Sequence, residues 1–388
     1  RRCVQETELI FPFVIACSLG ALSSCSSDID RVKPDRKVID TEDVSRLTRL
    51  DRYIQKAFAE KYNVSIDYRY DDKMTDRRYL LAPVKEEKAV EFLNLIDFVF
   101  FETYKEAAPE GYAQRHTVKF VNLYGSSGYA MDRRMAGAAP QGMIWMYNIN
   151  ELNTRIDRAK LDDRAKDYAY WIASKRVTAE IERLDEEAKA KTGTGLTDAE
   201  KQQLKDELTP KYEQEELSGE RFQVHIRTAT LELAQRMRSS YISTLFHESA
   251  HTLHEERAYP PEYDKLSALD YQKQDAFSYW WRNGKESLHA GFVSDYASTD
   301  ADEDFAELFA TYVLSSDGEW DELLTKADAK IRTSAKYTGK EIILQKLAIM
   351  KQYIRDEYST DLDAIRQKAL EKLYQIPYKD FTQYPAGY

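Results

Sequence analysis

The chain has 388 residues, and its 67 acidic side chains outnumber its 56 basic ones, which gives a formal net charge of -11 at pH 7. We do not expect an acidic chain without an evident basic face to bind nucleic acid, because phosphate contacts require clustered lysine and arginine. Beyond residue 30 no apolar stretch approaches the roughly 20 residues that span a bilayer, so no transmembrane helix is expected in the body of the protein.

The N-terminus carries the pattern of an exported lipoprotein. Two arginines precede an apolar stretch from Leu9 to Leu22, and Leu22-Ser23-Ser24-Cys25 fits a lipobox, in which small residues precede a cysteine that becomes lipidated. Here the chain resembles a bacterial lipoprotein precursor, which implies a signal peptide over residues 1–24, a lipid on Cys25 and a polar tether over residues 25–40. An uncleaved anchor is the less favoured alternative, because the apolar stretch is too short to span a bilayer.

Residues 41–150 are predicted to form an N-terminal α/β part with a sheet. Apolar residues with a helical period predict helices, and short β-rich runs bounded by turn residues predict strands. The expected helices are Asp43–Tyr62 and Val84–Lys105, and the expected strands are Val64–Tyr70, Thr117–Tyr124 and Gly142–Tyr147.

Residues 151–220 differ in composition, being rich in charge and poor in large apolar side chains. Thr192-Gly-Thr-Gly195 interrupts the stretch, and Thr197-Asp-Ala-Glu200 is a capping box that starts a new helix. We predict a charged helical insertion, solvated on its outer faces, with a substrate-binding lid as the alternative.

Residues 221–318 contain the most informative motif, His247-Glu248-Ser-Ala-His251, on a stretch without Gly or Pro from 220 to 258 in which Leu231, Ala234, Tyr241 and Leu245 recur with a helical period. Residues four apart lie on one face of a helix, so both imidazoles can reach one metal ion with Glu248 beside it. This spacing predicts a zinc hydrolase with Glu248 as general base. The alternative is an exposed helix with two unrelated histidines.

A catalytic zinc ion usually has three protein ligands, so a third must come from elsewhere. The metzincin pattern is excluded, because His254 stands where its glycine should be and Arg257 where its third histidine should be. Downstream, Glu303 and Glu307 lie four apart on a predicted amphipathic helix, and we select Glu303 as the ligand. The local sequence fits equally well with Asp300 as a helix cap, Glu303 as its capping-box partner and Glu307 merely solvated.

The paired motifs resemble those of the metallopeptidase domain of anthrax lethal factor, in which a tyrosine precedes an E-x-F-A-E helix by seven residues. Tyr296 and Glu303-Asp-Phe-Ala-Glu307 match that arrangement within a resemblance confined to about residues 240–315. It implies His247, His251 and Glu303 as ligands, Glu248 as base, Tyr296 as the hydroxyl that stabilises an oxyanion, and Glu307 as a hydrogen-bonding partner of a ligand.

His254 lies close to the same helix face as the two motif histidines. It remains open as an alternative ligand, although a role outside the ligand set, supporting a ligand or facing substrate, or a solvated position, is favoured because three histidines from one helix would crowd the ion. His116, His225 and His289 have no partner at ligand spacing and are predicted to be structural.

Residues 319–388 are predicted as a C-terminal helical part, from the apolar stripes around Ile343 to Ile354 and Leu362 to Leu373. The predicted fold class is α+β: a zincin-like metallopeptidase, mostly helical, with a small mixed sheet under the active-site helix. In that fold an edge strand pairs with extended substrate, so Gly142–Tyr147 is a candidate groove wall.

In organisation the chain resembles the lipoproteins known as substrate import-associated zinc metallohydrolases, encoded beside TonB-dependent outer-membrane importers. This resemblance implies an outer-membrane, lipid-anchored protein that cooperates with an importer. We therefore predict a zinc metallopeptidase with one Zn²⁺ per chain, acting on peptides or glycoprotein-derived substrates. The alternatives are a surface binding protein with a structural zinc ion and a zinc amidase acting on a non-peptide amide.

Overall fold

The computed structural model describes residues 47–70, 81–130, 133–135, 143–156, 158–272 and 276–388. The chain divides into a unit Arg1–Leu47, of which only Leu47 is described, and a unit Thr48–Tyr388, to which everything below refers. The predicted signal peptide, Cys25 and the whole of the predicted tether therefore lie outside the described residues. Within the described ranges, no helix combines the length and the apolar character needed to cross a membrane.

The N-terminal part confirms the predicted succession of helices and strands. Its strands form a three-stranded parallel sheet in the order β1-β2-β5, with Ser65 paired to Phe120 and Phe120 paired to Met143. β5 thus lies at one edge of this sheet, and β3 (Gly128–Ala130) and β4 (Arg133–Met135) form a separate antiparallel pair. The elements are α1 (Arg49–Ile54), η2 (Gln55–Ala59), α2 (Glu60–Tyr62), β1 (Ser65–Asp67), α3 (Glu86–Ile96), η3 (Asp97–Phe101), α4 (Glu102–Ala107), α5 (Tyr112–His116), β2 (Phe120–Leu123), β5 (Met143–Met146) and η4 (Ile149–Glu151).

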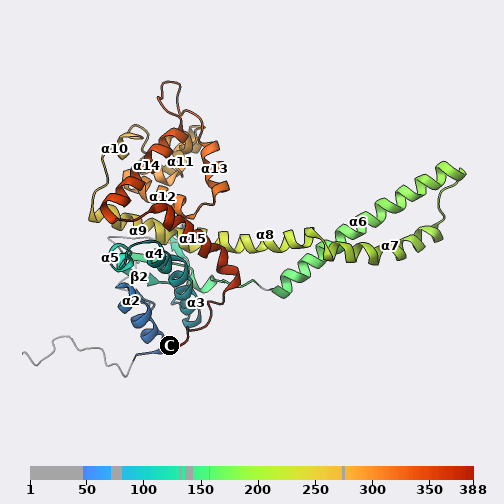
Figure 1. Cartoon of the computed structure of the whole chain (residues 1–388), viewed down its shortest axis with the longest axis horizontal. Coiled ribbons are helices and arrows are strands. Elements are labelled where there is room, and N and C mark those ends of the chain that lie inside the picture. Colours follow the sequence, from blue (N-terminus) through green and yellow to red (C-terminus); the bar gives the residue numbers. More distant parts are fainter. Residues whose placement is uncertain (1–46, 71–80, 131–132, 136–142, 157, 273–275) are drawn as a thin grey trace, which may run out of the picture. The chain divides into compact units, whose positions relative to one another are not determined.

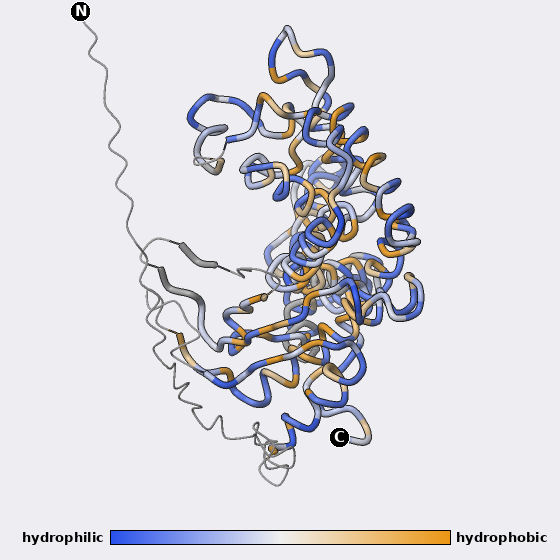
Figure 2. The backbone as a smooth tube through the Cα atoms, turned by 90° about the vertical axis from the view of Figure 1, so that its left-hand side faces the viewer, coloured by the Kyte–Doolittle hydropathy of each residue, from blue (hydrophilic) through white to orange (hydrophobic). Residues whose placement is uncertain are grey.

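The remaining elements are helical, so the α+β fold class, mostly helical with a small sheet, is confirmed (Figure 1). The sheet was predicted to be mixed, but β1, β2 and β5 all pair in parallel, and the antiparallel pair β3-β4 is separate from them. In Figure 2 apolar and polar residues alternate along the helical turns, as expected of helices that bury one face. These elements are α6 (Arg158–Thr192), α7 (Asp198–Ser218), α8 (Glu220–Met237), η5 (Arg238–Ile242), α9 (Ser243–Glu256), α10 (Glu262–Lys265), α11 (Ala276–Arg282), η6 (Ser287–Ala290), η7 (Tyr296–Ser298), α12 (Ala301–Leu314), α13 (Asp317–Lys326), α14 (Gly339–Tyr358), α15 (Leu362–Gln375) and η8 (Ile376–Tyr378).

Helices α6 and α7 lie side by side as a long hairpin (Figure 1). The Thr197 side chain accepts the Glu200 amide and Glu200 reaches back to Thr197, so the predicted capping box starts α7. Ion pairs from Arg176 to Glu215 and Glu216 join the two helices. Apolar burial along α6 is confined to a narrow stripe of small side chains, as the charged composition predicts: Ala165, Ala169, Ala173 and Val177.

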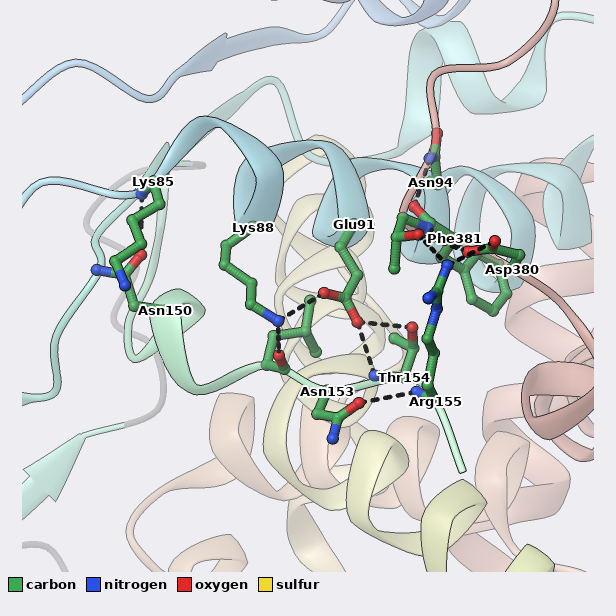
Figure 3. Close-up of polar contacts among 12 residues, drawn as sticks. Lys85, Lys88, Glu91, Asn94, Asn150, Asn153, Thr154, Arg155, Asp380 and Phe381 are labelled. Carbon is green, nitrogen blue, oxygen red and sulfur yellow. Dashed lines mark hydrogen bonds and ion pairs between the residues drawn. The ribbon is translucent and has the colours of Figure 1, made fainter. Parts of the chain in front are cut away.

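A buried carboxylate anchors the segment between the sheet and the hairpin, as Figure 3 shows. Glu91 on α3 is 2% exposed, and it accepts hydrogen bonds from the amide and the hydroxyl of Thr154. Lys88 donates to both Glu91 and the Leu152 carbonyl, which balances the buried charge. Arg155, the next residue after Thr154, forms an ion pair with Asp380, so the C-terminal segment also contacts this connecting segment.

Helices α8 and α9 follow one another along a single helical segment, joined by the π-helical turn η5, which ends about one turn before the histidine motif. Leu233, Met237, Tyr241 and Leu245 are all buried, whereas Leu231, which we placed on the same apolar face, is 47% exposed. That assignment was wrong because a π-turn contains about one residue more than an α-turn, which shifts the phase of the pattern upstream by about 100°.

Helix α9 is held between the N-terminal core and the C-terminal helices. Phe246 packs edge-to-face on Phe100 of η3, with ring centroids 5.1 Å apart, and α9 also packs along α12. The hydroxyls of Tyr353 and Tyr358 on α14 both donate to the carbonyl of Leu253 near the end of α9. The Leu253 carbonyl also accepts the Arg257 amide at 3.0 Å, so the two hydroxyls add contacts from α14 that fix the end of the motif-bearing helix.

Candidate metal centre

Three predicted ligands from two helices converge at the contact between α9 and α12. The Nε2 atoms of His247 and His251 lie 3.1 Å apart, and the Oε2 of Glu303 lies 3.1 Å from the former and 3.5 Å from the latter. Among the residues that the structure describes, these three side chains make up the group able to hold a metal ion.

The spacing of these three atoms fits a tetrahedral zinc site. Two zinc bonds of about 2.0–2.1 Å at a tetrahedral angle separate their ligand atoms by about 3.3 Å, close to the three separations found here. The Oε2 of Glu303 is buried and makes no well-oriented hydrogen bond, although two imidazole nitrogens lie beside it. A buried carboxylate oxygen in this position is satisfied by a cation that all three atoms share.

Each of the two predicted ligand imidazoles has a polar neighbour at its outer nitrogen. The Nδ1 of His247 lies 3.0 Å from Glu307, and the Nδ1 of His251 lies 2.8 Å from the Nε2 of His254. The other nitrogen of His254 lies 3.7 Å from Asp302. His254 therefore supports His251 from behind, and the structure does not bring it into the ligand group. Outer partners of this kind fix the tautomer and the orientation of a ligand histidine.

The start of α12 combines capping with ligand presentation. Asp300 caps the helix by accepting the amides of Asp302 and Glu303, each at 3.0 Å. The Glu303 carboxylate turns toward the imidazoles, so Asp300 is a cap without Glu303 acting as a capping-box partner. Glu307 is not merely solvated, since it lies beside His247 and accepts a hydrogen bond from Ser294 at 2.6 Å.

Electrostatics in the site follow from burial and the close carboxylates. Burial lowers the pKa of His247, but Glu303 and Glu307 outweigh it and raise that pKa to about 10. Burial raises the pKa of Glu303, but the imidazoles of His247 and His251 outweigh it and bring the pKa well below its usual range. For Glu248, burial dominates and its pKa is raised, which is the direction that suits a proton acceptor near neutral pH.

Tyr296 lies on η7, with its ring centroid 6.1 Å from that of His247. Burial and the nearby Glu303 carboxylate raise its pKa, so the phenol stays protonated and able to donate a hydrogen bond. The turn is held from two sides, because Ser287 donates to Asp295 and the Trp280 indole donates to Ser298.

The remaining histidines lie outside this group. His116 pairs with Glu256 at 2.7 Å and packs edge-to-face on Tyr112 and Tyr358, as expected of a structural residue. His289 lies 3.7 Å from Glu286, and the side chain of His225 is outside what the structure describes. Sequence reasoning missed Asp302 and Ser294 as neighbours of the site, because a polar residue in an acidic loop carries no pattern that separates it from a solvated one.

Comparisons with known proteins agree with this geometry. Residues 43–179 and 215–363 match the model of a family described as "Putative zinc-binding metallo-peptidase", and the unmatched residues 180–214 lie in the outer part of the α6–α7 hairpin. The fold is similar to a crystal structure described as "a putative zinc-binding metallo-peptidase" from Bacteroides caccae, with a TM-score of 0.55 and 20% identity, covering 86% of this chain and 94% of that chain. No curated protein matches the sequence.

Proposed function

Because the chain belongs to the zinc-binding metallo-peptidase family that its sequence matches, we propose that it is a zinc-dependent metallopeptidase with His247, His251 and Glu303 as the metal ligands. The observation that carries this proposal is the convergence of three ligand atoms near the half-buried Glu248. A structural zinc site usually has four protein ligands, whereas a catalytic site has three and keeps one position open.

Glu248 is the proposed general base and acid. When bound, Zn²⁺ supplies a Lewis acid that lowers the pKa of water toward neutrality and polarises a carbonyl. Glu248 follows the first ligand histidine, and its raised pKa suits it to accept a proton from the attacking water and pass it to the leaving amine. Proton transfer by such a group contributes roughly 10²–10⁴-fold to the rate.

Tyr296 is proposed to stabilise the negative charge that develops on the carbonyl oxygen. Its phenol stays neutral because burial raises its pKa, so it can donate a hydrogen bond. This hydrogen bond strengthens as the oxygen gains charge, and it therefore lowers the barrier more than it strengthens substrate binding. The roles of Glu248 and Tyr296 are those implied by the resemblance to the lethal factor metallopeptidase domain.

The proposal also covers the substrate class and the location of the protein. β5 is an edge strand among the described strands of its sheet, and an extended peptide can add to such an edge through backbone hydrogen bonds. We propose peptides or glycoprotein-derived chains as substrates. The lipobox supports a lipid on Cys25 and an outer-membrane location, and the resemblance to import-associated lipoproteins supports cooperation with a TonB-dependent importer.

Hydrolysis of a diverse peptide library by the zinc-loaded protein tests this function. We expect cleavage that a chelator abolishes and that Glu248→Gln lowers by at least 10²-fold while one zinc ion per chain remains bound. Cleavage restricted to non-peptide amides would favour the amidase alternative. Zinc binding without turnover of any amide would favour a binding protein with a structural metal ion.

A further inference from the structure

The hydroxyl of Ser294 joins two parts of the site that come from different segments. It donates a hydrogen bond to the Oε2 of Glu307 at 2.6 Å and accepts one from the backbone amide of Ala297 at 3.1 Å. The other oxygen of Glu307 lies 3.0 Å from the Nδ1 of His247. Ala297 directly follows Tyr296 in η7 and is fully buried.

This contact exceeds what local capping of a short turn requires. A serine that only capped η7 would need the bond to Ala297, three residues ahead, and no partner on α12. The bond to Glu307 uses the carboxylate oxygen that does not face His247, so both oxygens of Glu307 have a polar neighbour and the carboxylate is restrained beside the Nδ1 of His247. A carboxylate held in this way keeps a metal-ligating imidazole in one orientation.

We propose that Ser294 is a positioning residue that aligns His247 through Glu307 and, through the Ala297 amide, holds the turn that places the Tyr296 hydroxyl. The Tyr296 half of this inference rests on the proposed function. The His247 half concerns metal affinity alone, and it stands whether or not the protein cleaves peptides.

Metal affinity tests the first half. Zinc affinity is measured on the whole protein by competition with pyridine-2,6-dicarboxylate for Ser294→Ala, Ser294→Thr and the matched control Ser287→Ala, which removes the η6 hydroxyl that contacts the same turn at Asp295. We expect Ser294→Ala to bind zinc about tenfold or more weakly, and the other two to stay within about twofold of the unaltered protein. An unchanged affinity in Ser294→Ala, or an equal loss in Ser287→Ala, would overturn this half.

A double-mutant cycle tests the second half. Saturated with zinc, Ser294→Ala is expected to lower kcat about tenfold with little change in KM, and to have no further effect on kcat in a Tyr296→Phe background. Equal losses in both backgrounds would show that Ser294 does not act through Tyr296. If Ser294→Ala does not fold, Ser294→Cys replaces it, since a thiol is a weak donor and acceptor of similar shape.

The two arms separate the possible failures. If the zinc-loaded unaltered protein cleaves no peptide, the proposed function fails, and the competition experiment still decides whether Ser294 supports the ligand His247. If peptides are cleaved and Ser294→Ala behaves as the unaltered protein in both arms, only the inference about Ser294 fails.

Discussion

The Nε2 of His254 lies 2.8 Å from the Nδ1 of His251, while the Nε2 of His251 faces His247 and Glu303. His254 thus lies at the outer nitrogen of His251, as Glu307 lies at the outer nitrogen of His247. Because Asp302 lies near the far nitrogen of His254, a chain of polar side chains runs from the ligand group to the first turn of α12.

His254→Ala is expected to weaken zinc affinity about 10–100-fold, because His251 loses the partner that orients its ring. The comparison variant is His289→Ala, whose imidazole has no contact with the ligand group and whose loss should change the affinity less than twofold. Chelator competition gives both values. Equal affinities for the two variants would show that His254 does not support His251.

Glu303→Ala is expected to lose tightly bound zinc, and Glu307→Gln is expected to keep about one zinc ion per chain with a 10–100-fold weaker affinity. Elemental mass spectrometry after dialysis distinguishes the two outcomes. The reverse pattern, with zinc retained in the first variant and lost in the second, would identify Glu307 as the ligand.

Glu319→Gln is expected to lower the free energy of unfolding at pH 7 by about 0.5–1 kcal/mol, since the carboxylate caps α13 at Ser316 and pairs with Arg238 in η5 but is partly exposed. Burial raises the pKa of Glu319, but the Ser316 amide and Arg238 outweigh it and lower that pKa. A carboxylate with a lowered pKa stabilises the fold above its unfolded pKa of about 4.3, and this contribution is lost as the pH falls through the folded value.

The difference between the unaltered protein and Glu319→Gln should therefore stay constant from pH 7 to about pH 5 and shrink as the pH falls below about 4.3, which urea unfolding at several pH values measures. Glu322→Gln is the control, because its carboxylate is 67% exposed and pairs only with Lys326 on the same helix. A pH-independent difference for Glu319→Gln would contradict the assigned ion pair.

Lys346→Met is expected to destabilise the protein by about 3–5 kcal/mol, because it leaves the buried Asp304 carboxylate without its cation. Lys346 is 0% exposed and Asp304 1%, and the ammonium donates to Asp304 at 2.5 Å and to the Gly291 carbonyl at 2.9 Å. The double variant with Asp304→Leu should recover part of that loss, since no unpaired charge remains. Equal or greater destabilisation in the double variant, measured by urea unfolding, would argue against this explanation.

Several features of the fold and the site were predictable because they depend on short spacings. His247 and His251 are four apart on one helix, and the apolar residues Phe305, Leu308 and Phe309 fix which face of α12 turns to α9. The roles outside the ligand group were not predictable in this way. The contact between Ser294 and Glu307 depends on how a loop folds against a helix, and the separation of the two residues in the sequence matches no helical or strand period.

The pairing direction of the strands could not be predicted from the local sequence either. Short strands show where a sheet forms, whereas their direction depends on the path of the chain between them. Between β1 and β2 the chain passes through α3, η3, α4 and α5, a connection long enough to return it to the same end of the sheet, so the two strands pair in parallel.

The π-turn η5 restricts how the length of this chain can change. Losing one residue from Arg238–Ile242 would convert the turn to a regular α-helix and rotate α8 by about 100° relative to His247 and His251. The face of α8 that contacts the α6–α7 hairpin would then also rotate about the helix axis, which would displace the hairpin. Insertions or deletions at the closing loop of the hairpin, near Gly193, impose no such rotation, so variation in length among related chains should concentrate there and spare the five residues of η5.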